Sequence, residues 1–89
     1  MIMNFNAFKA NVRENLTDYL PSNITEGNEV VIEPIIKIND RFVHALSLKG
    51  EGSYHASPII YLENYYQMYC DCEDFESVIK TIAFQIMEA

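Results

Sequence analysis

The stretch from Ser57 to Tyr69 changes its hydrophobic period partway along, which restricts the structures it can form. Residues Pro58–Leu62 alternate as a strand with one buried face does, and proline suits the first position of a strand because it has no N–H to donate to a ladder. The apolar residues then recur at helical steps, at Leu62, Tyr65, Tyr66 and Tyr69. The stretch therefore predicts a short strand that runs directly into a helix.

The first twenty residues carry an apolar stripe of helical period. The stripe consists of Phe5, Phe8, Val12, Leu16 and Tyr19 or Leu20. The side-chain oxygen of Asn4 or Asn6 can cap this helix, and Pro21 ends it. We expect a helix over residues 4–20 and then a loop to about residue 28, because Pro, Ser, Asn and Gly are frequent there.

Two alternating runs follow and predict a β-hairpin. In the first run, one face carries Val30, Ile32, Ile36 and Ile38, and the other carries Glu29, Glu33 and Lys37. The second run alternates through Phe42, His44, Leu46 and Leu48. Asn39–Asp40 supplies residues that tolerate a tight turn. Pro34 cannot donate to a ladder, so the first strand should be an edge strand or contain a bulge.

The last helix has the clearest apolar stripe in the chain. Its residues are Phe75, Val78, Ile79, Ile82, Ala83 and Ile86. Asp74 is a suitable N-cap, and acidic side chains near it are favoured by the helix dipole. At about 100° per residue, Phe84 lies nearly opposite the stripe. It is therefore either an exposed aromatic residue or one that something covers.

These elements follow the order α-β-β-β-α-α. We expect a single domain over residues 1–89 that folds without a cofactor. The fold class is α+β: a two-layer structure in which a three-stranded antiparallel β-meander carries helices on one face.

Charge and composition argue against several classes of partner. Thirteen acidic and six basic side chains give a formal charge of −7, which repels nucleic acid and anionic lipid. The apolar runs are far shorter than the roughly 18 residues of a membrane helix, and the N-terminus lacks the pattern of a signal peptide. A bridge between Cys70 and Cys72 would close a strained ring, so we expect reduced thiols. We predict a cytoplasmic protein that binds neither nucleic acid nor membrane.

The residue types used in catalysis and metal binding are present without a supporting pattern. Cys70 and Cys72 could bind a soft metal, or form a nucleophile pair, with His44 or His55. Zinc sites normally use thiols two to four residues apart and a second pair. The acidic residues between 71 and 76 lack the spacing of a calcium loop, and helix capping explains them. We expect no catalytic, cofactor-binding or metal-binding residues.

Tyrosine is concentrated between residues 54 and 69. Its ring supplies a large contact area with a polar tip, and it is enriched at protein interfaces. Some of these rings should seal the sheet against the helices, which leaves the others for a partner. The candidate protein-contact residues are Tyr54, Tyr65, Tyr66, Tyr69 and Phe84.

The run Ser57–Tyr66 has the form S-P-x-I-Y-L-E-x-[FY]-Y and resembles the signature of an uncharacterised bacterial domain-of-unknown-function family, number 5688. The first helix and the Asn39–Asp40 turn are also similar, so the resemblance covers nearly the whole chain and implies the family's N-terminal portion. Family members usually have glycine where this chain has Arg41 and Cys72. The family has no established activity, so the resemblance implies no catalytic residues.

The expected function is that of a non-enzymatic protein-interaction or structural module in a bacterial cytoplasmic protein. The alternative is the N-terminal structural half of a larger enzyme or regulator whose active part lies outside this chain. The expected partner is either another protein or the remainder of a longer chain. The oligomeric state stays open.

Overall fold

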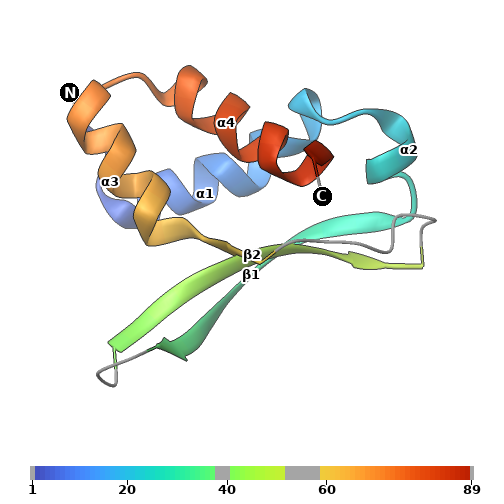
Figure 1. Ribbon diagram of the computed structural model, residues 1–89, viewed down its shortest axis with the longest axis horizontal. Coiled ribbons are helices and arrows are strands. Elements are labelled where there is room, and N and C mark those ends of the chain that lie inside the picture. The colour runs from blue at the N-terminus through green and yellow to red at the C-terminus, as the bar shows by residue number, and fades with distance from the viewer. Residues whose placement is uncertain (1, 38–40, 52–58, 89) are drawn as a thin grey trace.

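The computed structural model of the chain describes residues 2–37, 41–51 and 59–88, with only the backbone described at residues 36, 37, 41 and 42. The elements in chain order are α1 (Phe5–Asn15), the 3-10 helix η1 (Leu16–Tyr19), α2 (Ser22–Thr25), β1 (Asn28–Lys37), β2 (Arg41–Gly50), β3 (Ile60–Tyr61), α3 (Leu62–Cys72) and α4 (Phe75–Glu88). The strands form an antiparallel sheet of order β1-β2-β3, and the helices lie on one side of it (Figure 1). The predicted α+β fold and meander are confirmed.

The N-terminal helix begins at the predicted place and changes type before its predicted end. Asn4 is the cap, because its side-chain Oδ1 accepts the N–H of Ala7 at 2.9 Å. The predicted loop was wrong in one part: α2 forms a single turn there, and the Pro21 carbonyl accepts the N–H groups of Ile24 and Thr25. Proline lacks an N–H that a helix start would leave unpaired, so Pro21 both ends one helix and allows the next to begin.

The β1–β2 hairpin has a regular register that runs from Asn28 opposite Gly50 to Lys37 opposite Arg41. The predicted turn at Asn39–Asp40 lies outside the described residues. The expected core face is confirmed where side chains are described, since Leu46 and Leu48 are buried and lie opposite the partly buried Ile32 and Val30. Ile38 and the side chains of Ile36 and Phe42 lie outside the described residues.

Pro34 occupies a position at which its missing backbone N–H removes no hydrogen bond from the sheet. It lies opposite His44, whose backbone N–H donates to Glu63 on the far side of β2. Paired residues of antiparallel strands direct their N–H groups either both inward or both outward. The backbone nitrogen of Pro34 therefore faces the outer edge of β1. The register contains no bulge, so the edge-strand prediction is the one that holds.

The predicted strand-to-helix change is present, with a shorter strand than expected. Ile60 pairs with Leu46, and the helix begins at Leu62, while Pro58 lies outside the described residues. Helix α3 ends at Glu73, which adopts the left-handed conformation and donates its N–H to the Tyr69 carbonyl at 2.8 Å.

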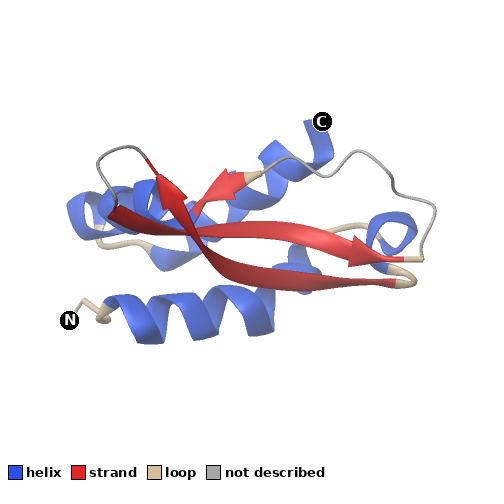
Figure 2. Cartoon of the chain, turned by 90° about the horizontal axis from the view of Figure 1, so that it is seen from below, coloured by secondary structure: helices blue, strands red, loops and turns tan. Residues whose placement is uncertain are grey.

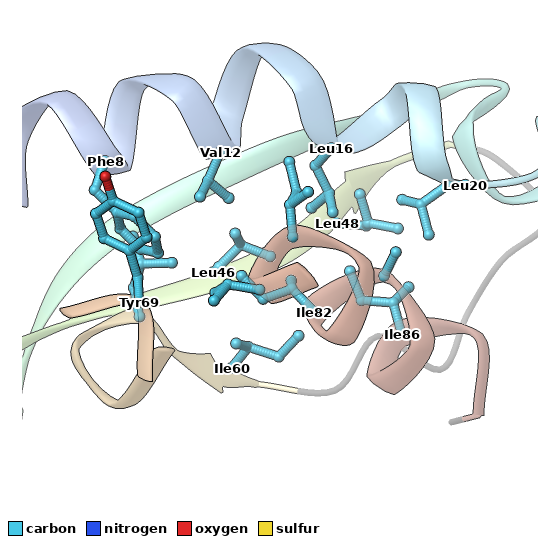
Figure 3. Close-up of a cluster of buried hydrophobic side chains, with 14 of the residues drawn as sticks. Phe8, Val12, Leu16, Leu20, Leu46, Leu48, Ile60, Tyr69, Ile82 and Ile86 are labelled. Carbon is cyan, nitrogen blue, oxygen red and sulfur yellow. The ribbon is translucent and has the colours of Figure 1, made fainter. Parts of the chain in front are cut away.

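The core lies between the sheet and the helices (Figure 3). The largest fully buried side chains among the described residues are Phe8, Val12, Leu16, Leu46, Leu62, Val78, Ile79, Ile82 and Ile86. Burying each aliphatic side chain of this size contributes roughly 1.5–3 kcal/mol. Asp74 begins α4 as predicted, because its carboxylate accepts hydrogen bonds from the Ser77 hydroxyl at 2.6 Å and from the Ser77 N–H at 3.3 Å. Among the described helices, none is long and apolar enough to cross a membrane.

Candidate functional site

Two of the tyrosines predicted for a contact surface instead hold the N-terminal segment. Tyr69 is 4% exposed, and its hydroxyl accepts the N–H of Met3 at 3.1 Å. The Tyr66 hydroxyl donates to the backbone carbonyl of Met3 at 2.8 Å. A buried backbone group needs a hydrogen-bond partner, and these hydroxyls supply both. Including Tyr69 in an exposed surface was therefore wrong, and the hydroxyl of Tyr66 is already engaged.

The same tyrosines complete an aromatic cluster in the core. The ring of Phe8 stacks on Tyr69 with centroids 5.4 Å apart, and it meets the edges of Tyr66 at 5.3 Å and Phe75 at 5.7 Å. Such pairs stabilise a core by roughly 0.5–1.5 kcal/mol beyond their area. Burial raises the pKa of the Tyr66 phenol, and a hydrogen bond with Cys70 raises it further.

Of the remaining predicted contact residues, Tyr65 lies on α3 and Phe84 lies on α4. Tyr65 is half-buried against the core, and this burial raises its pKa. Phe84 is 53% exposed on the outer face of α4, where the helical period had placed it. Tyr54 lies outside the described residues.

The cysteines differ in exposure and belong to no metal-binding cluster among the described residues. Cys70 is half-buried and Cys72 is exposed, and neither forms a disulfide. Within residues 2–37, 41–51 and 59–88, no three His, Cys, Asp or Glu side chains gather closely enough to hold a metal ion. His55 is outside those ranges.

His44 is a hydrogen-bonded sheet residue, as its strand position indicated. Its Nδ1 lies 2.7 Å from Oε2 of Glu63, and its backbone N–H donates to Oε1 of the same carboxylate, also at 2.7 Å. The ring of Phe5 packs on the imidazole with centroids 5.0 Å apart. The Glu63 carboxylate thus accepts a backbone hydrogen bond from β2 at the point where α3 begins and β3 no longer pairs with β2. The sequence reasoning missed this contact, although Glu63 is the glutamate of the S-P-x-I-Y-L-E run.

The largest feature that the sequence reasoning missed is the second face of the sheet. Several of the positions that alternate with the core residues are also apolar, with Glu29, Glu33 and Lys49 between them, and no described helix covers this side of the sheet (Figure 2). Ile59 is 64% exposed and Tyr61 is 36% exposed, and the side chains of the two longer strands beside them are partly exposed. We call this surface the open face, and it consists of Val31, Ile35, Val43, Ala45, Ser47, Ile59 and Tyr61.

The open face is continuous across the three strands. Val31 lies opposite Ser47, Ile35 lies opposite Val43, and Ala45 lies between Glu33 and Tyr61. A shallow hollow of about 330 Å³ runs over it, and its lining consists of Glu33, Ile35, Ala45, Ser47, Leu48, Lys49 and Ile59. The sequence contained a signal for this face, because β1 and β2 carry apolar residues at both alternations.

Fold and surface together define a small two-layer α+β domain whose sheet has one packed face and one open, partly apolar face. The chain belongs to a family of unknown function, DUF5688, whose sequence model matches residues 5–89. The family expected from the Ser57–Tyr66 run is therefore confirmed. No match to the chain was found among curated proteins or among solved structures.

Proposed function

We propose that this domain is a non-enzymatic module that contacts another protein through the open face of its sheet. The observation that supports it is the exposure of Ile59 and Tyr61 beside the partly exposed apolar side chains of the paired strands, around the ion pair of Glu33 and Lys49. Contiguous apolar surface on a folded domain marks an interaction site, whereas single exposed apolar residues are ordinary. Burying it would contribute about 25 cal/mol per Å² of apolar area before the costs of association.

The engagement of the polar groups supports a non-enzymatic role. His44 and Glu63 bind each other, and the hydroxyls of Tyr66 and Tyr69 bind the backbone of Met3. These hydrogen bonds join the N-terminal segment to α3 and join α3 to β2. The alternative, an N-terminal portion of a larger enzyme or regulator, stays a prediction, and the open face would then contact the rest of that protein.

Photo-crosslinking in the native cells tests the proposal. A photoreactive amino acid is placed at position 59, on the open face, and in a separate variant at position 84, on the outer side of α4. These sites have similar exposure, 64% and 53%; position 59 directly precedes β3 of the sheet, and position 84 lies within α4. We expect a discrete protein adduct, identified by mass, from position 59 and none from position 84.

Two results would overturn the proposal. One is the absence of an adduct from position 59 in a variant that is folded by circular dichroism. The other is a discrete adduct from position 84 alone, because the contact would then involve the helical layer.

A further inference from the structure

We infer that the occupant of the open face is an amphipathic helix of another protein with basic side chains toward one end, an inference that rests on the proposed function. The small residues of the face, Ala45 and Ser47, lie on the central strand β2. Larger side chains flank them on both sides: Val31, Glu33 and Ile35 on β1, and Ile59 and Tyr61 at β3. The face is therefore a trough that runs along β2 between two rims, and the hollow of about 330 Å³ lies over its floor.

The width of the trough matches a single helix. Neighbouring strands lie about 4.8 Å apart, so the rims on β1 and β3 are about 10 Å apart, and a helix with its side chains is about 10–12 Å across. A second sheet would rest on both rims and leave Ala45 and Ser47 without packing partners. A lone extended segment would bury backbone N–H and C=O groups against side chains that cannot pair with them, whereas a helix pairs these groups internally.

One end of the trough is acidic. A second hollow, of about 480 Å³, lies toward Gly50, and Lys49 belongs to the lining of both hollows. The second lining carries the exposed carboxylates of Glu29 and Glu51. Lys49 does not neutralise them, because its Nζ is bound to Oε1 of Glu33 at 2.9 Å. The occupant therefore needs apolar side chains over the first hollow and cationic side chains over the second.

The length of the trough gives the length of the helix. From Val43 to Gly50, β2 runs about 23 Å at about 3.3 Å per residue, a distance that a helix spans with about 15 residues. The formal charge of −7 on the whole chain attracts a cationic partner at long range and increases its rate of association at low salt. Shape, local charge and net charge thus select the same occupant.

Synthetic peptides titrated into the isotope-labelled whole chain at about 0.15 M salt test this occupant by nuclear magnetic resonance. The basic peptide has about 15 residues, with leucine along one helical stripe and lysine and alanine elsewhere. A scrambled peptide has the same composition without the stripe, and an acidic peptide has glutamate in place of lysine. We expect the basic peptide to shift the amide resonances of Glu29, Ala45 and Ser47 saturably below about 1 mM and to leave that of Phe84 unchanged. It should bind at least about tenfold more tightly than either control peptide.

Two matched pairs of variants locate the contact. Ile59→Asp changes a rim of the trough and should weaken binding of the basic peptide at least about tenfold. Phe84→Asp, on α4, should leave binding unaltered. Glu29→Gln should weaken binding about two- to fivefold, whereas Glu14→Gln, the same change at an exposed position of α1, should leave it unaltered. Thermal unfolding of all four variants verifies that they fold.

Equal binding of the basic and scrambled peptides, or no saturable shift up to about 1 mM, would overturn the inference. Binding that Phe84→Asp weakens and Ile59→Asp does not would also overturn it, and equal effects of Glu29→Gln and Glu14→Gln would overturn the assigned basic end. If the basic peptide fails and position 59 still crosslinks to a protein in the native cells, the inference ends and the proposed function is retained. Loss of that crosslink as well would end both.

Discussion

Replacing Glu73 with glycine should stabilise the domain. Glu73 closes α3 with φ 55° and ψ 27°, and it is the one non-glycine residue with positive φ in the described part of the chain. An L-residue in this conformation costs roughly 1–2 kcal/mol, a cost that glycine avoids at a helix C-terminus. Glycine also gives the unfolded chain more freedom, which costs roughly 0.5–1 kcal/mol. The expected net gain is about 0.5–1 kcal/mol in the free energy of unfolding.

Urea and thermal unfolding measure this gain, which corresponds to a rise of about 2–8 °C in Tm for a domain of this size. Glu73→Ala is the first control, because it removes the carboxylate and keeps the strained conformation. Asp71→Gly is the second, because it places glycine inside α3, where it should destabilise by about 0.3 kcal/mol, the difference between the helix propensities of aspartate and glycine. The reasoning is refuted if Glu73→Gly is no more stable than Glu73→Ala.

Three further substitutions test other parts of the structure. Gly50→Ala should cost at least about 3 kcal/mol in urea unfolding, because its Cβ would lie 2.1 Å from the Gly27 carbonyl oxygen, a backbone atom. Tyr69→Phe should cost about 1 kcal/mol, because the N–H of Met3 loses its acceptor. Asp74→Asn should show a pH-dependent loss. Hydrogen bonds from the first turn of α4 hold the pKa of Asp74 below its ordinary value of 3.8, so the carboxylate stabilises the fold above about pH 4 and loses this contribution as pH falls through the native pKa.

Each of these expectations has a result that contradicts it. A Gly50→Ala variant as stable as the parent would mean that the β1–β2 hairpin opens there without cost. Tyr65→Phe is the control for Tyr69→Phe, since no described residue hydrogen-bonds to the Tyr65 hydroxyl. An equal loss of stability in both variants would mean that the hydrogen bond between Tyr69 and Met3 contributes nothing of its own. A stability difference between Asp74→Asn and the parent that stays constant from pH 6 to pH 2 would exclude the proposed titration.

Local periodicity was sufficient to predict most of the fold. The stripe of α4 and the alternation of β2 depend on neighbouring residues, and both were predicted with the correct buried face. The one-turn helix α2 was missed because proline and serine mark loops and helix starts alike. Its Ile24, buried in the core, was the remaining signal.

The site was harder to predict because it depends on contacts between residues that are far apart in the sequence. Tyr66 and Tyr69 bond to Met3, more than sixty positions away, so composition alone suggested a surface where the structure has an interior. The open face follows from which side of the sheet the helices cover. Alternation shows that both sides of β1 carry apolar residues, and it does not say which side receives the helices.

The crosslink from position 59 in the native cells is the most direct test of whether the open face is where this domain meets another protein. The account predicts a discrete adduct at position 59, none at position 84, and loss of the adduct when Ala45, next to Tyr61 on the same face, is replaced by arginine. A folded variant that gives no adduct at position 59 would contradict the account.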